Sequence, residues 1–119
     1  MAKKEDTTDK DFALKSAKIA LDRHCTDVSI LDLRRISPAT NYFVIATDTS
    51  GRQARSVADE ICQCAKECGF QRFGQAGYEH GKWILIDFID VVVHVFDAEH
   101  RDYYNLEMLW GDAKKLKID

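Results

Sequence analysis

Four aspartates at the ends of expected strands are the residues whose type and spacing come nearest to catalytic chemistry. Asp32 and Asp48 end runs of apolar residues, and Asp87 and Asp90 flank a tight turn. Clustered carboxylates can hold metal ions for phosphoryl transfer. A nucleotidyltransferase needs two acids one residue apart on a strand, after a glycine-serine helix start, whereas Asp87 and Asp90 are three residues apart across a turn. We therefore interpret Asp90 as a turn former and Asp87 as a strand-ladder or cross-strand partner, and we expect no catalytic residues.

The cysteines and histidines form no pattern that is typical of a metal or redox site. Cys64 and Cys68 are four residues apart and share a helix face, but no C-x-x-C pair occurs. Free thiols packed as small hydrophobes are the favoured interpretation, and a zinc site using this pair and a distant histidine is the alternative. The chain also lacks the glycine-rich phosphate-binding motifs. We expect no cofactor and no metal.

Two long helices and four strands would position these residues. Apolar spacing predicts a helix over residues 8–24, capped by Thr8, and a second helix that starts with the capping box of Ser50 and Gln53 and stops at Gly69. Apolar runs predict strands over 28–33, 42–47, 83–88 and 91–96, followed by a helical stretch from Asp97 through Trp110. An extra short strand within residues 70–81 is left open.

This order predicts an α/β fold with a mixed sheet and helices packed on it. The β-α-β crossover implies parallel pairing and the tight hairpin implies antiparallel pairing. A length of 119 residues suits one domain, which we place at residues 9–113, after a flexible lead-in at 1–8 and before a frayed basic tail at 114–119. No apolar run of about 18 residues occurs and the N-terminus has no apolar signal region, so the expected location is the cytoplasm, with no membrane contact.

Charge is distributed unevenly along the chain. The net charge is −3, from 17 basic and 20 acidic residues. Residues 77–113 contain eight acids and two bases, so this segment is −6 and the rest of the chain is +3. Both tryptophans lie in the same segment. An acidic, aromatic region argues against nucleic acid as the main partner and favours a basic protein.

Several ordered blocks of sequence resemble the ribosomal silencing factor family, also called RsfS or Iojap-like proteins. The resemblance covers about residues 13–113. Residues 83–96, WILIDFIDVVVHVF, are similar to the family's W-[VI]-L-[LI]-D-[YFL]-G-D-V-[VI]-V-H-[VI]-F core. Residues 101–113, RDYYNLEMLWGDA, are similar to its R-x-[FY]-Y-x-L-E-x-L-W-x-D-A ending. Residues 31–33 and 40–45 fit its first two strands.

Three positions depart from the family pattern. Ile89 replaces the glycine before the hairpin aspartate, and because a primed two-residue turn needs positive φ, we expect a wider turn or another type. Ala76 replaces a glutamate before Gly77, which puts any role of that glutamate in doubt. Asp48 replaces the glycine of the family's Gly-Thr-Ser and adds an acid at the helix start.

The resemblance implies a non-enzymatic translation repressor with a nucleotidyltransferase-like topology that lacks the catalytic motif. Family members bind the large ribosomal subunit through its fourteenth ribosomal protein, on the intersubunit face, and block joining of the small subunit. Ribosomal RNA is then at most a peripheral contact, and a homodimer could form off the ribosome. The alternative is a degenerate nucleotidyltransferase-like protein that binds nucleotides.

The strand pairing expected in the hairpin indicates where the partner surface lies. A two-residue connection would pair Trp83 with Phe96, and Leu85 with His94, on one mixed face, while isoleucines and valines line the other. The alternative for Trp83 is packing under residues 70–81, and for the last helix a plain apolar stripe. Trp83 and Phe88 are carried over from the family as partner contacts, and the remaining predicted partner-binding residues are Asp87, Asp90, His94, Tyr104 and Asn105.

Overall fold

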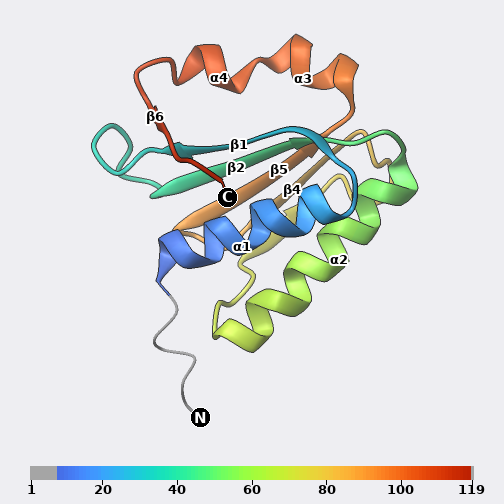
Figure 1. The fold of residues 1–119 in the computed structure, drawn as a ribbon, viewed down its shortest axis with the longest axis horizontal. Helices are drawn as coiled ribbons and strands as arrows, with labels where there is room; N and C mark the ends of the chain where they lie inside the picture. Colours follow the sequence, from blue (N-terminus) through green and yellow to red (C-terminus); the bar gives the residue numbers. More distant parts are fainter. Residues whose placement is uncertain (1–7, 119) are drawn as a thin grey trace.

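One mixed sheet organises the molecule (Figure 1). The structure is a computed structural model that describes residues 8–118, without the side chains of Tyr103 and Tyr104. Its elements are α1 (Asp9–Asp22), β1 (Thr26–Asp32), β2 (Tyr42–Thr47), α2 (Gly51–Cys68), β3 (Gly74–Ala76), β4 (Trp83–Asp87), β5 (Val91–Phe96), α3 (Ala98–Tyr104), α4 (Leu106–Leu109) and β6 (Lys114–Lys115). The strand order is β3-β4-β5-β2-β1-β6, with β2 and β5 parallel and the other neighbours antiparallel. This arrangement confirms the predicted α/β class.

Helices cover both faces of the sheet. The long helices α1 and α2 lie on one face, and the short helices α3 and α4 lie over the other, above β1 and β2 (Figure 1). We call the face under α3 and α4 the mixed face. Among the described residues, none of the helices combines the length and the apolar character needed to cross a bilayer.

Local signals set the ends of both long helices as predicted. The Thr8 hydroxyl accepts a hydrogen bond from the Asp11 backbone N–H at 3.1 Å, and the Asp11 carboxylate accepts one from the Thr8 N–H, which completes a capping box. Ser50 caps α2 by accepting from the Gln53 N–H, but the predicted capping box is not completed, because the Gln53 side chain accepts from the Thr49 N–H and not from that of Ser50. Gly69 ends α2 with a φ of 83°, a conformation that glycine adopts without strain.

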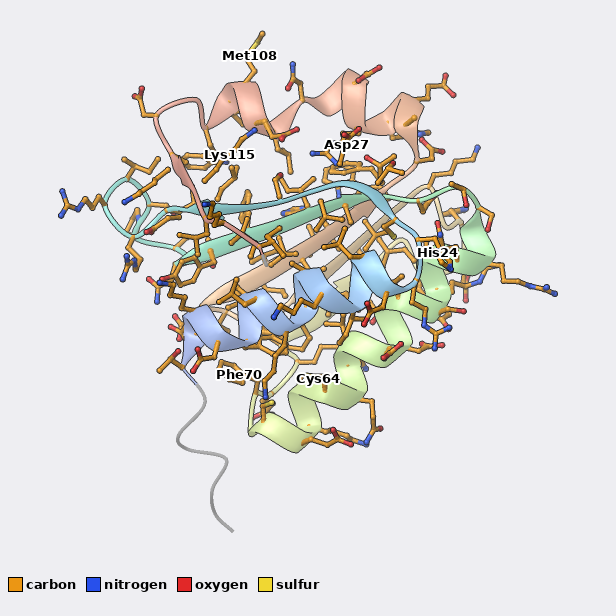
Figure 2. The ribbon with its side chains drawn as sticks, viewed as in Figure 1. His24, Asp27, Cys64, Phe70, Met108 and Lys115 are labelled. Carbon is orange, nitrogen blue, oxygen red and sulfur yellow. The ribbon has the colours of Figure 1, made fainter. Side chains whose placement is uncertain are left out.

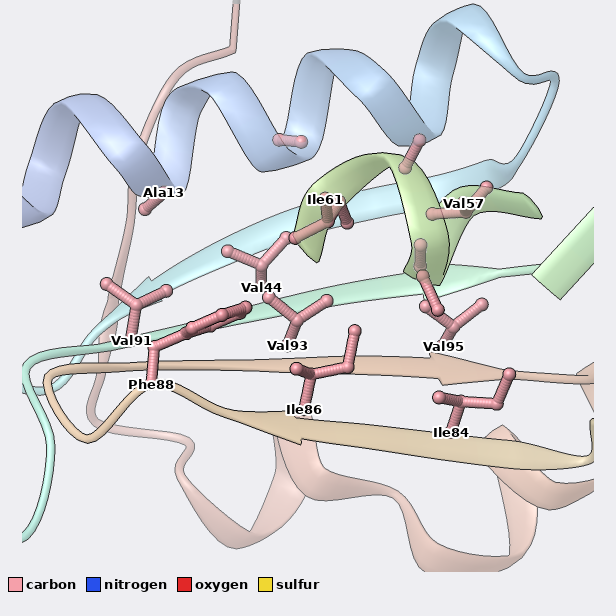
Figure 3. Close-up of a cluster of buried hydrophobic side chains, with 14 of the residues drawn as sticks. Ala13, Val44, Val57, Ile61, Ile84, Ile86, Phe88, Val91, Val93 and Val95 are labelled. Atoms are coloured by element: carbon pink, nitrogen blue, oxygen red, sulfur yellow. The ribbon is translucent and has the colours of Figure 1, made fainter. Parts of the chain in front are cut away.

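The main core lies between the long helices and the sheet (Figure 3). Alternation along β4 and β5 sends every second side chain into this layer, as the sequence predicts. The helices contribute a stripe of small and branched residues that is fully buried. The labelled members in Figure 3 include Ala13, Val57, Ile61, Ile84, Ile86, Val93 and Val95.

The β4–β5 hairpin has the predicted register, and of the two expected alternatives for its turn, a wider turn or another type, the structure shows the second. Trp83 lies opposite Phe96, and Asp87 lies opposite Val92. The turn stays tight, with Ile89 at a φ of 73°, where a branched side chain is strained. Two hydrogen bonds hold it there: the Asp90 N–H donates to the Phe88 carbonyl, and the Ile89 N–H donates to the Asp87 carboxylate at 2.7 Å. A side-chain acceptor thus stabilises a turn that glycine would form unaided.

The predicted last helix is interrupted at Asn105. This residue takes a left-handed conformation, with a φ of 43°, and ends α3. Its side chain then accepts a hydrogen bond from the Met108 N–H and caps α4. Asparagine tolerates this conformation better than most residues, which is the physical reason for two short helices in place of one.

The C-terminal tail also differs from the prediction. We expected residues 114–119 to be frayed, but Lys114 and Lys115 form β6 on the outer edge of β1. The Leu116 N–H continues the pairing by donating to the Ile30 carbonyl at 2.9 Å. The proposed lead-in lies outside the described residues except for Thr8.

Candidate functional site

Trp83 is half-buried on the mixed face, at the residue where β4 begins. Its indole ring stacks on Phe96 with centroids 4.8 Å apart, and its Nε1–H donates to His94 Nδ1 at 3.2 Å. It also packs against the cluster formed by Leu31, Leu33, Ile45 and Phe96. The ring is therefore held in one orientation and keeps part of its surface exposed.

His94 lies beneath this arrangement and is only 3% exposed. Burial lowers the pKa of His94 to about 4, so the imidazole is neutral at physiological pH. Since Nδ1 accepts from Trp83, the proton of the neutral ring sits on Nε2, which has no hydrogen-bond partner. His94 therefore supports Trp83 from below and offers no surface of its own.

Asp87 and Asp90 lie together at the opposite end of β4, on the hairpin. Asp87 is half-buried, and its carboxylate accepts the hydrogen bond from the Ile89 N–H in the turn. Asp90 has an exposed side chain, while its carbonyl accepts from the N–H groups of Asn41 and Tyr42 at the start of β2. The hairpin thus presents two carboxylates on a backbone that is hydrogen-bonded to the neighbouring strand.

Phe88 does not lie on this surface, and its role as a partner contact stays a prediction that its position in the core does not support. Its side chain is 4% exposed and meets the Phe12 ring of α1 edge-on, with centroids 5.0 Å apart. The alternation that buries Ile84 and Ile86 places Phe88 on the same core face (Figure 3).

The C-terminal candidates lie apart from the hairpin. Asn105 is exposed at the junction of α3 and α4, where its side chain serves as the cap of α4. The Tyr104 side chain lies outside the described part of the structure. The structure therefore brings Trp83 and His94 into contact, keeps Asp87 with Asp90, and leaves Asn105 on a separate element.

The carboxylates that could suggest metal-dependent chemistry do not converge. Asp32 lies opposite Tyr42 at one end of β2, and Asp48 follows the other end, so a six-residue strand of roughly 20 Å separates them. Asp32 is bound by the Arg34 guanidinium at 2.8 and 3.0 Å, which lowers its pKa. Within residues 8–118, no group of three histidine, cysteine or acidic side chains is placed to hold a metal ion.

Asp48 is the least expected of these carboxylates. Both of its oxygens are buried and have no hydrogen-bond partner. Burial, and then the nearby charge of Asp97, raise the pKa of Asp48 to about 7. Burial of this carboxyl group without a hydrogen-bond partner destabilises the folded state.

The four cysteines are free thiols. The Sγ atoms of Cys64 and Cys68 lie 3.9 Å apart on α2, beside the Lys15 ammonium. Burial, and then the neighbouring Cys68, raise the pKa of Cys64 to about 11, which keeps it a thiol and not a reactive thiolate. This agrees with the interpretation of these residues as packed thiols.

Sequence reasoning missed two residues that shape the mixed face. The centroid of the half-buried Phe43 ring lies 4.5 Å from that of the His94 ring. The unbroken apolar run around Phe43 did not indicate which face of the sheet this ring occupies. Arg101 is half-buried and donates hydrogen bonds to the Glu107 carboxylate, Thr47 Oγ1 and the Asp27 carbonyl. It thereby holds α3 and α4 against the sheet. The signal in the sequence was that Arg101 is one of two bases in the acidic segment 77–113.

The fold and this surface define a class of protein. It is a single α/β domain whose mixed face carries a half-buried tryptophan, with two carboxylates at the far end of the same strand. Tryptophan supplies buried area in protein interfaces, and flanking carboxylates supply orientation and attraction for a basic partner. The arrangement suits binding of another macromolecule.

Comparison with known proteins identifies the family. The family model described as "Ribosomal silencing factor during starvation" (RsfS) matches residues 6–119. The ribosomal silencing factor RsfS of Bacillus subtilis is 42% identical over 98 residues, which cover 82% of this chain and 83% of that protein. The chloroplastic protein Iojap of Zea mays is 32% identical over 90% of this chain, which spans 46% of that longer protein. This chain belongs to the RsfS family.

Solved structures agree with this assignment. A crystal structure of a Chromobacterium violaceum protein superposes with a TM-score of 0.82 at 32% identity, covering 92% of this chain and 90% of that chain. A Bacillus halodurans protein gives a TM-score of 0.74 at 34% identity, covering 90% and 94% of the two chains.

Proposed function

We propose that this chain is a non-enzymatic ribosomal silencing factor of the cytoplasm. It binds the large subunit through the fourteenth large-subunit ribosomal protein and blocks joining of the small subunit. Its relatives are named ribosomal silencing factors, which supports the general role. The observation that carries the finer proposal is the position of Trp83 on the mixed face, on the same strand as Asp87.

The chemistry of this surface fits a basic protein. Trp83 is already oriented by Phe96 and His94, so docking on it costs little side-chain entropy. Asp87 and Asp90 are fixed by the hairpin, and their segment carries a net charge of −6. A partner rich in lysine and arginine would be attracted at long range and then bury the indole.

Co-sedimentation with purified large subunits tests the proposal. Trp83→Ala should weaken binding by about 2 kcal/mol, or roughly 30-fold, because a tryptophan at an interface centre is a typical hot spot. Tyr78→Ala is the matched control, since Tyr78 is also half-buried but packs on the α1–α2 side, where its hydroxyl binds Asp59. Circular dichroism of both variants separates lost binding from lost folding.

The outcome decides the proposal. The wild-type chain should also lower the fraction of joined ribosomes when small subunits are added. Failure of the wild type to sediment with large subunits, or equal binding by Trp83→Ala and wild type, would refute the assignment of this surface.

The carboxylates have a separate test. Asp87→Asn with Asp90→Asn keeps hydrogen-bond acceptors but removes two charges, so the association rate should fall, most strongly at low salt. Asp22→Asn with Glu67→Gln makes the same charge change on the exposed surface of α1 and α2 and serves as the control. Equal rates for the two double variants would contradict steering by the hairpin.

We also propose that a second copy of the chain can occupy the C-terminal surface off the ribosome. Met108 and Leu109 are 76% and 72% exposed beside Ile36, an apolar group that favours self-association. Sedimentation velocity should show a dimer that Met108→Lys abolishes, and a monomer at all concentrations would refute it.

A further inference from the structure

Basic side chains from two distant parts of the sequence gather at one edge of the sheet. The loop after β1 contributes two arginines and the C-terminal strand contributes three lysines, all exposed. We call this set the basic edge: Arg34, Arg35, Lys114, Lys115 and Lys117.

The pairing of β6 with β1 creates the basic edge. Lys114 lies opposite Asp32, and Lys115 lies opposite Leu31, so the chain returns to the end of β1 after residues 33–113. Figure 1 shows β6 beside β1 and next to the loop that carries the arginines, and Figure 2 labels Lys115 there. A frayed tail would not hold these charges together.

The basic edge keeps excess positive charge. Asp32 binds Arg34, and Glu107 lies 3.5 Å from Lys115 and also binds Arg101. Two of the five cations, Arg34 and Lys115, are therefore paired with acids. Arg35, Lys114 and Lys117 have no ion pair within the part of the chain that the structure describes.

Protection of a sheet edge does not account for this set. Lysines on an edge strand discourage pairing with other chains, which can explain Lys114 and Lys115. Arg34 and Arg35 lie in the loop after β1, outside the β1–β6 ladder, so they add charge where no strand edge needs protection. The side chain of Arg34 is 57% exposed and lies over the Tyr42 ring, at 5.5 Å, which orients its guanidinium.

The position of the basic edge relative to Trp83 suggests the partner. β6 is four strands away from β4, or about 19 Å at the usual strand spacing. The acidic, aromatic surface and the basic edge can therefore contact different molecules at once. Exposed cations along a sheet edge are suited to a sugar–phosphate backbone, which needs charge and not base recognition.

We propose that the basic edge contacts the phosphate backbone of ribosomal RNA that adjoins the protein partner on the large subunit. The inference rests on the proposed function and adds an RNA contact to it. Each phosphate neutralised releases counterions, so the contact must appear in the salt dependence of binding.

The experiment compares two variants with the same charge change. Arg35→Gln with Lys117→Gln removes two cations of the basic edge and leaves the Asp32–Arg34 and Glu107–Lys115 pairs intact. Lys18→Gln with Lys66→Gln removes two exposed cations from α1 and α2. Binding is measured at several salt concentrations, to whole large subunits and to the isolated fourteenth ribosomal protein.

We expect the basic-edge variant to bind whole subunits about tenfold more weakly at low salt, with a log–log salt slope smaller by about 2. It should bind the isolated ribosomal protein as the wild type does, and the control should match the wild type in both assays. An unchanged slope on whole subunits, or equal weakening on the isolated protein, would overturn the RNA contact while leaving the proposed function standing. Failure of the wild type to bind whole subunits would instead overturn the function, and the inference with it.

Discussion

Asp48 and His94 are buried titratable groups that should act on folding stability in opposite directions as pH changes. The folded-state pKa of Asp48 is raised to about 7, and that of His94 is lowered to about 4. Their ordinary values are about 3.9 and 6.5. Both differences arise mainly from burial, since each side chain holds polar atoms that lack a hydrogen-bond partner.

The sign of each effect follows from which state binds more protons. Between about pH 4 and 7 the folded protein keeps the Asp48 proton and the unfolded chain loses it, so this group lowers stability as pH rises. Between about pH 4 and 6.5 the unfolded chain protonates His94 and the folded protein does not, so this group raises stability as pH rises. Each slope is about 1.4 kcal/mol per pH unit at most, and the two oppose each other.

The free energy of unfolding of the wild type should therefore change little between about pH 4.5 and 6.5. In the single variants Asp48→Asn and His94→Gln it should change with pH. Asp48→Asn removes the Asp48 slope and leaves that of His94, so the free energy of unfolding of this variant should rise by about 2–3 kcal/mol as the pH increases from about 4.5 to 6.5. His94→Gln should show the reverse, a fall of similar size that extends to about pH 7. The carboxyl groups of Asp32, Asp97 and Glu107 have lowered pKa values and lose their stabilising effect at more acidic pH, outside this window.

Urea denaturation at half-unit pH steps measures these slopes. The slope is the informative quantity, because a buried amide at position 48 or a packing defect at position 94 shifts all values alike. The double variant should be flat again and serves as the control. Parallel curves for wild type and Asp48→Asn would refute the assignment of a raised pKa to Asp48.

Three further predictions concern the framework around the site. Ile89→Gly should stabilise the chain by about 1 kcal/mol in urea denaturation, because it relieves the strained positive φ at 73°, and a loss of stability would contradict that strain. Arg101→Met should destabilise the chain by about 3 kcal/mol, since it leaves Glu107 without the Arg101 guanidinium. Faster proteolysis between residues 97 and 113 should accompany this loss. Unchanged protection of that segment would show that Arg101 does not anchor α3 and α4. Asn105→Ala should lower the free energy of unfolding by about 1–2 kcal/mol, and Asn105→Gly should lower it clearly less. Alanine is strained in the left-handed conformation and removes the cap of α4, whereas glycine removes only the cap. Equal losses for the two variants would argue against this geometry.

Elements that depend on neighbouring residues in the chain were predictable. The capping residues Thr8 and Ser50 and the stop at Gly69 act within a single turn of helix, so their effect needs no tertiary contact. The pairing of Trp83 with Phe96 follows from alternation and a short turn. The same alternation places Phe88 with Ile86 in the core, so the family-based assignment of Phe88 to the surface overrode a signal that the sequence did contain.

The sequence by itself determined the helices, the hairpin, the mixed sheet and the family, because periodicity and capping are local and the motifs are contiguous. Only the tertiary structure decided that β6 pairs with β1 and that Arg101 anchors the C-terminal segment. It also decided that the Asp48 carboxylate oxygens and His94 Nε2 are buried without hydrogen-bond partners. Each of these depends on which distant segment covers a residue. Burial and the electrostatic shifts that follow from it are properties of the packed molecule, and local pattern does not encode them.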